Sequence, residues 1–385
     1  MDATWRYPTQ IRSGAGRIAE IAYACVVAGT TRPLVVTDPG LVDLPPVRSL
    51  LGLLDDAGIP SGLFSDLRPN PVGRDVDAGT EVFRAGGHDG VIAIGGGSAL
   101  DIGKVIALQA HQTRPVWDFA YGGDDGAAEV DVSLVAPVVA VPTTAGTGSE
   151  VGRAGVVIDE ANRRKMIISH SAMLPVVVIA DPELTVGLPR VLTVGTGLDA
   201  LAHSLEAICS PDHHPMSQGI GMEGCRLVLE HLPTAVDSPA DLTARSHMLT
   251  AASMGAVAFH KGLGAIHALS HPVGAHFDTH HGMTNATFMP YVLLANRPAI
   301  EPIIERLAAY AGIAGGFDGF VDHIVELRAS LDVPHTLVDL GADPAAIDVI
   351  VEDAVLDPTA ATNPVPVDAD FAASIYEAAC TGRLG

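Results

Sequence analysis

The sequence predicts an α/β domain built on a mostly parallel, doubly wound sheet, followed by a second domain that is all-α. Up to about Pro189, short apolar runs alternate with segments of helical length, the order of elements that produces parallel sheets. The runs lack polar alternation, which is typical of strands covered on both faces. Beyond Pro189 the strand-like runs stop. We therefore expect domains at residues 1–185 and 186–385.

Four apolar runs rich in β-branched residues are the predicted strands of the first domain. They are Pro33–Thr37, Gly90–Ile94, Pro137–Val141 and Val176–Ala180. Between them, Val47–Ala57 and Asp75–Ala85 have helical length and turn residues at their ends. In the second domain, proline and glycine separate the predicted helices. These are Leu198–Ile208, Met216–His231, Asp241–Phe259, Ile300–Ala311, Phe317–Leu331 and Asp370–Cys380.

The balance of charge excludes two classes of partner. The 385 residues carry 22 Lys+Arg against 45 Asp+Glu, a formal net charge of −23. A surface this acidic repels phosphate backbones and anionic lipid headgroups, so neither nucleic acid nor a membrane is an expected partner. The 4 cysteines are widely spaced without a CxxC pair, and no signal-peptide pattern is visible. A cytoplasmic protein is therefore expected.

A glycine-rich segment follows the second predicted strand. It reads Gly95-Gly96-Gly97-Ser98 and continues to Asp101 and Lys104. Glycines let the backbone approach a ligand closely, and Ser98 with Asp101 predicts a capping box at the start of a helix. Free N–H groups at such a helix end favour an anion, here a pyrophosphate. The alternative is a tight strand-to-helix turn without a ligand.

Two further strand ends suit a dinucleotide. The Thr- and Gly-rich loop Pro142–Glu150 follows the third predicted strand and suits contacts to ribose, phosphate or nicotinamide. Asp38 follows the first, where a carboxylate can bind the adenosine ribose and repel a 2′-phosphate, although Asp38-Pro39-Gly40 also reads as a simple turn. Gly14–Ala19 matches a loose GxGxxA pattern. The segment before it is a weak strand, so we favour the Gly95 loop for the phosphates.

Histidines in the second half form the strongest chemical pattern. Asp199 and His203 are four residues apart in a segment with helical character, and such spacing places both on one helix face. His267 and His271 form a second such pair, and His280-His281 follows shortly after. A single histidine of this kind is more often a core or surface residue. Together, one carboxylate and several imidazoles among Ala, Leu and Gly indicate a divalent transition-metal site.

Taken in the order in which they occur along the chain, these motifs resemble those of the iron-containing (group III) alcohol dehydrogenases over nearly the whole sequence. The resemblance rests on Gly95–Ser98 with Asp101 and Lys104, Pro142–Glu150, Asp181-Pro182, Gly197–His203, and the run from His267 through His281-Gly282 to Asn285. It implies a dinucleotide-binding α/β domain followed by a helical metal-binding domain. It implies these metal ligands: Asp199, His203, His267 and His281. The implied contacts to NAD are Asp38, Asn70, Gly96, Gly97, Ser98, Asp101, Thr143, Thr144, Thr147 and Lys165.

The activity this predicts is reversible hydride transfer between NAD(H) and a small primary alcohol or aldehyde. A Lewis-acidic metal, Fe²⁺ or alternatively Zn²⁺, lowers the pKa of the alcohol oxygen. His271 matches a family histidine close to the substrate and is the expected proton relay. Lys165 is expected to reach the cofactor or the substrate, unless it belongs to a solvated charge run. Relatives of this kind form dimers or larger assemblies, so a homo-oligomer is expected.

Other activities within the same superfold stay open. The substrate can instead be a hydroxy acid or semialdehyde, with Arg153 or Lys261 as the partner of its carboxylate. A maleylacetate-type reductase is disfavoured, because we expect Asn in place of Asp199 there. An enzyme of the glycerol dehydrogenase or dehydroquinate synthase type has different histidine spacing. A non-enzymatic assembly protein has no need of a complete ligand set.

Overall fold

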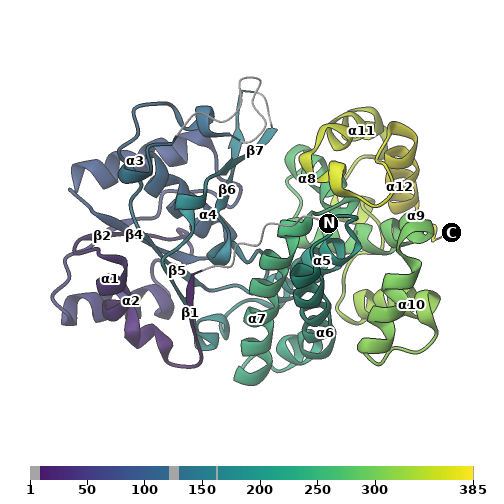
Figure 1. Cartoon of the computed structure of the whole chain (residues 1–385), viewed down its shortest axis with the longest axis horizontal. Coiled ribbons are helices and arrows are strands. Elements are labelled where there is room, and N and C mark those ends of the chain that lie inside the picture. The colour runs from purple at the N-terminus through teal and green to yellow at the C-terminus, as the bar shows by residue number, and fades with distance from the viewer. Residues whose placement is uncertain (1–8, 121–129, 162–163, 385) are drawn as a thin grey trace. The chain divides into compact units, whose positions relative to one another are not determined.

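The computed structural model describes residues 9–120, 130–161 and 164–384 (Figure 1). It divides into two compact units. The α/β unit comprises the described residues of Tyr7–Thr144 and Gly148–Leu188, and the helical unit comprises Ala145–Thr147 and the chain from Pro189 onward. Among the described residues, none of the helices combines the length and apolar character that crossing a bilayer requires.

The α/β unit is built on a parallel sheet of six strands. In spatial order the strands are β1 (Gln10–Ser13), β8 (Val177–Ala180), β5 (Val138–Pro142), β4 (Gly90–Gly95), β2 (Pro33–Val36) and β3 (Gly62–Phe64). The predicted parallel, doubly wound sheet is thus confirmed. Its two edge strands were not predicted, because each is short and only partly buried and lacks the continuous apolar run of the inner strands.

Helices cover both faces of this sheet, with α1 (Ile21–Ala28) and α2 (Pro45–Asp56) on one side and α3 (Gly73–Ala85) and α4 (Gly97–Gln109) on the other (Figure 1). Val35, Ile92 and Val139 point into the core that α1 and α2 cover. Their neighbours in sequence point the opposite way, as the two-residue period of a strand requires. The inner strands are buried along their whole length for this reason.

The strand order of the sheet reverses between β2 and β4. From β2 the chain crosses to β3 at one edge, then returns to β4 on the other side of β2. In open α/β sheets, ligands bind outside the carboxyl ends of the strands at such a switch point. Asp38 follows β2 and Gly96 follows β4, so both lie at this position.

A separate antiparallel pair, β6 (Ala154–Asp159) and β7 (Arg164–Ser169), was not predicted from the sequence. It packs against α4, because an added Cβ on Gly155 would lie 2.6 Å from the Val105 side chain. Lys165 lies on β7 opposite Ile158. Because β7 begins with the charged residues Arg164 and Lys165, it lacks the continuous apolar run by which the inner strands were predicted.

The helical unit contains α5 (Arg190–Cys209), α6 (Pro215–Asp237), α7 (Leu242–Ala258), α8 (Ala265–Phe277), α9 (His281–Tyr310), α10 (Gly316–Ser330), α11 (Ile347–Leu356) and α12 (Ala369–Thr381). The predicted all-α second domain is confirmed. The expected start of a helix at Ile300 was wrong, since α9 begins at His281 and passes through Pro290 and Pro298. Tertiary burial of its N-terminal half outweighs the hydrogen bonds that these prolines remove.

Candidate active site

Helix α5 carries the first donors of the candidate metal centre. It is buried along most of its length, and it packs against α6, α7 and α9. Asp199 and His203 lie one turn apart on this helix, and only 3% and 6% of their surfaces are exposed. A carboxylate at such depth is costly unless a cation or strong donors compensate its charge. The sequence spacing thus places both groups on one interior face of α5.

Three imidazoles converge on the Asp199 carboxylate. The Nε2 atoms of His203 and His267 lie 3.8 and 3.9 Å from Asp199 Oδ1. The Nε2 atom of His281 lies 3.6 Å from the same oxygen. These separations exceed hydrogen-bonding distance but suit donors that share an ion, which stand about 3.4 Å apart around a tetrahedral metal. The predicted ligand types and their geometry therefore fit a divalent transition metal.

Asn285, for which no role is predicted from the sequence, also contacts this cluster of predicted ligands. Its Nδ2 donates to Asp199 Oδ1 at 2.8 Å and lies 3.3 and 3.2 Å from Nε2 of His267 and His281. An amide has two hydrogens to offer these three atoms. Because the amide is neutral, it does not compensate the charge of the buried Asp199 carboxylate, which is a further indication of a cation site.

A close backbone approach brings His281 to the cluster. His281 begins α9, and an added Cβ on the next residue, Gly282, would lie 2.0 Å from the carbonyl oxygen of Gly195 on α5. Only glycine permits this contact. It fixes the start of α9 one turn from Asp199, and thereby sets the position of the His281 ring.

The pKa values of the two buried imidazoles His203 and His267 are shifted in opposite directions. Burial lowers the pKa of His203 to about 4, so this ring is neutral near neutral pH, the form that binds metal. Burial also acts to lower the pKa of His267, but the Glu206 carboxylate beside it outweighs that effect and raises the pKa. Glu206 lies one turn beyond His203, and its Oε2 is 2.6 Å from His267 Nδ1. Glu206 was not predicted as a site residue, although its spacing of three residues from His203 places it on the same helix face.

His271 lies beside the predicted metal ligands His267 and His281. Its ring stacks on that of His281 with centroids 5.5 Å apart. Its Nδ1 is 2.7 Å from Oδ2 of Asp357, a residue that the sequence analysis also missed. Burial acts to raise the pKa of Asp357, but the His271 ring and Thr359 hold it below its usual value. With Nδ1 engaged, Nε2 is the ring atom left for a ligand.

In the α/β unit, the glycine loop opens α4 without a side-chain cap. The predicted capping box was wrong, because the N-cap residue is Gly96 and the Ser98 hydroxyl donates to the carbonyl of Pro69 instead. Gly95 has φ +152°, which favours glycine, and Gly96 N donates to Asp38 Oδ2 at 3.3 Å. Burial raises the pKa of Asp38. The uncapped helix end nevertheless retains the donors expected of a phosphate site.

Asp101 and Lys104 tie α4 to the neighbouring loop. Asp101 accepts hydrogen bonds from the Ser149 hydroxyl and from Val156 N, so both of its oxygens have protein partners. The buried Lys104 Nζ donates to the carbonyl oxygens of Ser149 and Ala154. Desolvation lowers the pKa of this lysine. In this structure the two side chains shape the loop that was expected to contact the cofactor.

The other predicted cofactor residues lie near the glycine loop, on β7 or in the helical unit. Thr143 N donates to Gly95 O at 2.9 Å, and an added Cβ on Gly96 would contact Thr144 at 3.4 Å, so the two loops are adjacent. Asn70 follows Pro69 in the sequence, and the Pro69 carbonyl accepts the hydrogen bond from the Ser98 hydroxyl. Lys165 lies half-buried on β7, and Thr147 is grouped with the helical unit.

The Gly14–Ala19 segment and Lys261 both form hydrogen bonds with other parts of the protein. The amides of the Gly14–Ala19 segment are occupied, because Gly16 N and Ile18 N donate to the buried Asp181 carboxylate. Lys261 is a poor partner for a substrate carboxylate. It is 5% exposed, and its Nζ donates to carbonyl oxygens at the C-terminal end of α5, those of Ala207, Ile208 and Ser210. That expectation was wrong, since Lys261 caps a helix.

Comparisons with known proteins agree with this arrangement. Residues 8–182 match the family described as "Iron-containing alcohol dehydrogenase", and residues 193–380 match "Fe-containing alcohol dehydrogenase family, C-terminal". A 4-hydroxybutyrate dehydrogenase of Cupriavidus necator is 34% identical over 368 residues, which span 93% of this chain and 94% of that relative. A crystal structure of a 1,3-propanediol oxidoreductase has a TM-score of 0.92 at 32% identity and covers 98% of this chain and 100% of that chain.

A second solved structure, a sulfoacetaldehyde reductase from Bifidobacterium kashiwanohense in complex with NAD+, has a TM-score of 0.90 at 29% identity and covers 99% of both chains. An α/β unit with a phosphate-type loop and a helical unit with an Asp–His donor cluster together define a metal-dependent dehydrogenase. The chain belongs to the iron-containing alcohol dehydrogenase family. The predicted family and enzyme class are confirmed.

Proposed function

We propose that this protein interconverts a small primary alcohol and its aldehyde with NAD as the hydride carrier. The convergence of three imidazole Nε2 atoms on one buried carboxylate oxygen carries the proposal. The proposed metal ligands are Asp199, His203, His267 and His281. When bound, Fe²⁺ supplies Lewis acidity that lowers the pKa of an alcohol oxygen, and nicotinamide supplies the hydride acceptor.

The residues around the ligands have assignable roles. Asp199 supplies the negative charge that a divalent cation needs, and the three neutral imidazoles leave the centre with a net positive charge, which favours an alkoxide. We assign His271 as the proton relay, with its Nδ1 held by Asp357 and its Nε2 left to accept the alcohol proton. Asp357 orients the ring through this contact. Lys165 is proposed to contact the cofactor or the substrate.

The cofactor site is proposed at the carboxyl ends of β2, β4 and β5. Gly96, Gly97 and Ser98 present the start of α4 to the pyrophosphate, while Thr143 and Thr144 lie alongside. Asn70, Asp101, Thr147 and Lys165 complete the proposed set, with Asp101 acting through the loop that it holds. The relative solved in complex with NAD+ supports this choice of dinucleotide.

The preference for NAD over NADP is predicted to depend on Asp38. Replacing Asp38→Asn keeps an acceptor for Gly96 N–H but removes the charge that repels a 2′-phosphate. The ratio of kcat/KM for NAD to that for NADP should fall by roughly 5- to 30-fold, corresponding to about 1–2 kcal/mol of lost repulsion. Asp38→Gly should shift the ratio in the same direction. The exposed Asp43→Asn variant is the control, and an unchanged ratio in both Asp38 variants would remove the proposed role.

Removal of the metal tests the proposal as a whole. The purified protein should reduce NAD when supplied with small primary alcohols, and chelation should abolish the reaction because the alcohol oxygen then lacks its Lewis acid. Anaerobic addition of Fe²⁺ should restore it. The panel should include 4-hydroxybutyrate and 1,3-propanediol, since relatives are named for related substrates. Full turnover by protein that metal analysis shows to be free of metal would contradict the proposal.

We further propose a cytoplasmic homo-oligomer, in the simplest case a dimer. The described cysteines Cys25, Cys209, Cys225 and Cys380 are all free thiols, which suits a reducing compartment. Light scattering of the purified protein measures the number of subunits, and a monomer at all concentrations would contradict the oligomer.

A further inference from the structure

Glu206 occupies a junction between the metal cluster and the start of α8. It is 6% exposed, and its two oxygens have different partners. Oε1 accepts from the backbone N–H of Ile266 at 2.6 Å, and Oε2 lies 2.6 Å from Nδ1 of the next residue, His267. One carboxylate therefore caps the first turn of α8 and holds the ring of a proposed metal ligand.

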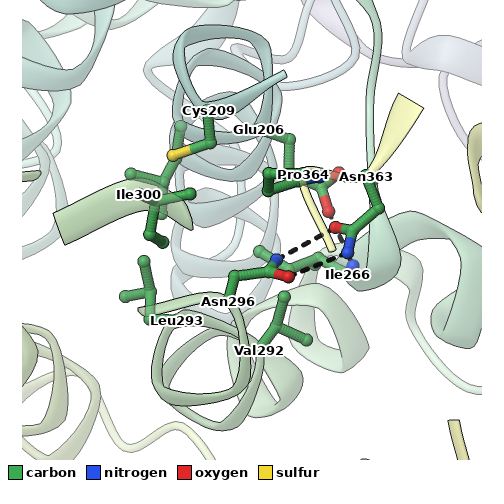
Figure 2. Close-up of a pocket in the computed structure, with 11 residues that line it drawn as sticks. Glu206, Cys209, Ile266, Val292, Leu293, Asn296, Ile300, Asn363 and Pro364 are labelled. Carbon is green, nitrogen blue, oxygen red and sulfur yellow. Dashed lines mark hydrogen bonds between the residues drawn. The ribbon is translucent and has the colours of Figure 1, made fainter. Parts of the chain in front are cut away.

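The surroundings of Glu206 hold it in place. Figure 2 shows Glu206 in a small pocket with Ile266, Asn296 and Asn363. The two asparagines exchange hydrogen bonds of 3.0 and 2.8 Å, and Asn363 Oδ1 also accepts from Ala265 N. The first N–H groups of α8 are thus divided between Asn363 and Glu206. Glu206 therefore lies at the N-terminus of the helix, where the helix dipole favours a negatively charged group.

Both carboxylate oxygens of Glu206 act as hydrogen-bond acceptors at this junction. A backbone N–H such as that of Ile266 can only donate, so Oε1 must accept. His267 Nδ1 must then also donate to Oε2, since an ionised carboxylate has no hydrogen to offer. When the His267 ring is neutral, as a metal ligand must be, its proton is therefore fixed on Nδ1. Its lone pair is left on Nε2, the atom that faces Asp199.

We propose that Glu206 is a positioning residue of the metal centre, which holds His267 in the tautomer and orientation that bind the metal. The inference rests on the proposed function, because it takes His267 as a metal ligand. Ligand imidazoles commonly donate their second N–H to a carboxylate, and loss of such a partner lowers metal affinity by about 10- to 100-fold. Here the same carboxylate also couples the ligand to the N-terminus of α8.

Two substitutions separate this role from simple space filling. Glu206→Gln preserves the shape but offers one acceptor and one donor; with the acceptor on Ile266 N–H, its NH₂ group forces the proton of His267 onto Nε2. Glu206→Asp is shorter but keeps two acceptors and the charge. A tautomer-setting role predicts that metal affinity falls in the order Glu, Asp, Gln. A packing role predicts that Gln is tolerated better than Asp.

Metal affinity of the full-length protein is the appropriate measurement. Competition between the metal-free protein and a chromophoric chelator for Zn²⁺ gives the dissociation constant, and the visible spectrum of the Co²⁺ form reports the ligand set. Glu206→Gln should weaken Zn²⁺ binding by about 10- to 100-fold and alter the Co²⁺ spectrum. Glu206→Asp should retain part of the affinity. Glu230→Gln, the same change at an exposed site on α6, should match wild type.

A stability control uses Asn363→Ala, which removes the other cap of α8 without touching the His267 ring. It should lower the melting temperature of the metal-free protein while leaving the Co²⁺ spectrum unchanged. Wild-type affinity in Glu206→Gln, or better binding in Gln than in Asp, overturns the role of Glu206 alone. If wild type binds neither Zn²⁺ nor Co²⁺, the proposed metal centre itself fails.

Discussion

Replacing Asp199→Asn should remove the metal and lower kcat/KM by about a thousandfold or more, the scale expected when about 4 kcal/mol of transition-state stabilisation is lost. Asp199 is the single negatively charged group among the four proposed ligands, and all three imidazoles face its Oδ1. An amide in its place binds a divalent cation weakly. Metal analysis of the purified variant and steady-state rates with added Fe²⁺ measure the two effects.

In the absence of metal, the Asp199→Asn substitution should not lower the thermal stability of the protein. A buried carboxylate costs desolvation energy that the Asn285 hydrogen bond offsets only in part. The metal-free Asp199→Asn protein should therefore melt at or above the temperature of metal-free wild type, while added metal should raise the melting temperature of wild type only. The exposed Asp212→Asn variant is the control. Retention of both metal and activity by Asp199→Asn would refute the assigned site.

Replacing Gly282→Ala should disrupt the metal centre without touching a ligand. The added methyl group would lie 2.0 Å from the Gly195 carbonyl oxygen and 3.2 Å from the Asp199 Cβ. Because the carbonyl belongs to the backbone of α5, it cannot rotate away, and the start of α9 must move with His281. We expect metal affinity to fall by about 10- to 100-fold, with a cost in stability of about 1–3 kcal/mol from overpacking. Metal titration and thermal melting measure both effects.

The predicted steric clash at Gly282 and the higher helix propensity of alanine have opposite effects on stability, so the Gly282→Ala variant distinguishes between them. Within a helix, replacing Gly by Ala ordinarily stabilises by about 0.5–1 kcal/mol. Gly219 on α6 is exposed and helical, and an added Cβ there meets no atom within 4 Å. Gly219→Ala should therefore melt at or slightly above the wild-type temperature, with normal metal binding. If Gly282→Ala behaves like Gly219→Ala, the contact between α5 and α9 does not position His281.

The elements that sequence predicted well are those with a local cause. Inner strands such as β4 need a continuous apolar run, because both faces are covered, and that run is visible without neighbours. The pairing of Asp199 with His203 likewise follows from helical spacing alone. By contrast, the edge strand β1 lacks this signal, and α9 contradicts its local propensity at Pro290. Their form depends on partners far away in the chain.

At the site, local sequence patterns were enough to predict the types of metal-binding side chain and which pairs share a helix face. They could not find Glu206 and Asp357, whose roles depend on contacts to His267 and His271 across 61 and 86 residues of chain. Nor could they show that the Ser98 hydroxyl serves Pro69 rather than its own helix. These hydrogen-bond partners are brought together by the folding of distant segments of the chain. Hydrogen bonds act over about 3 Å in space, while sequence patterns report distance only within one helix or strand.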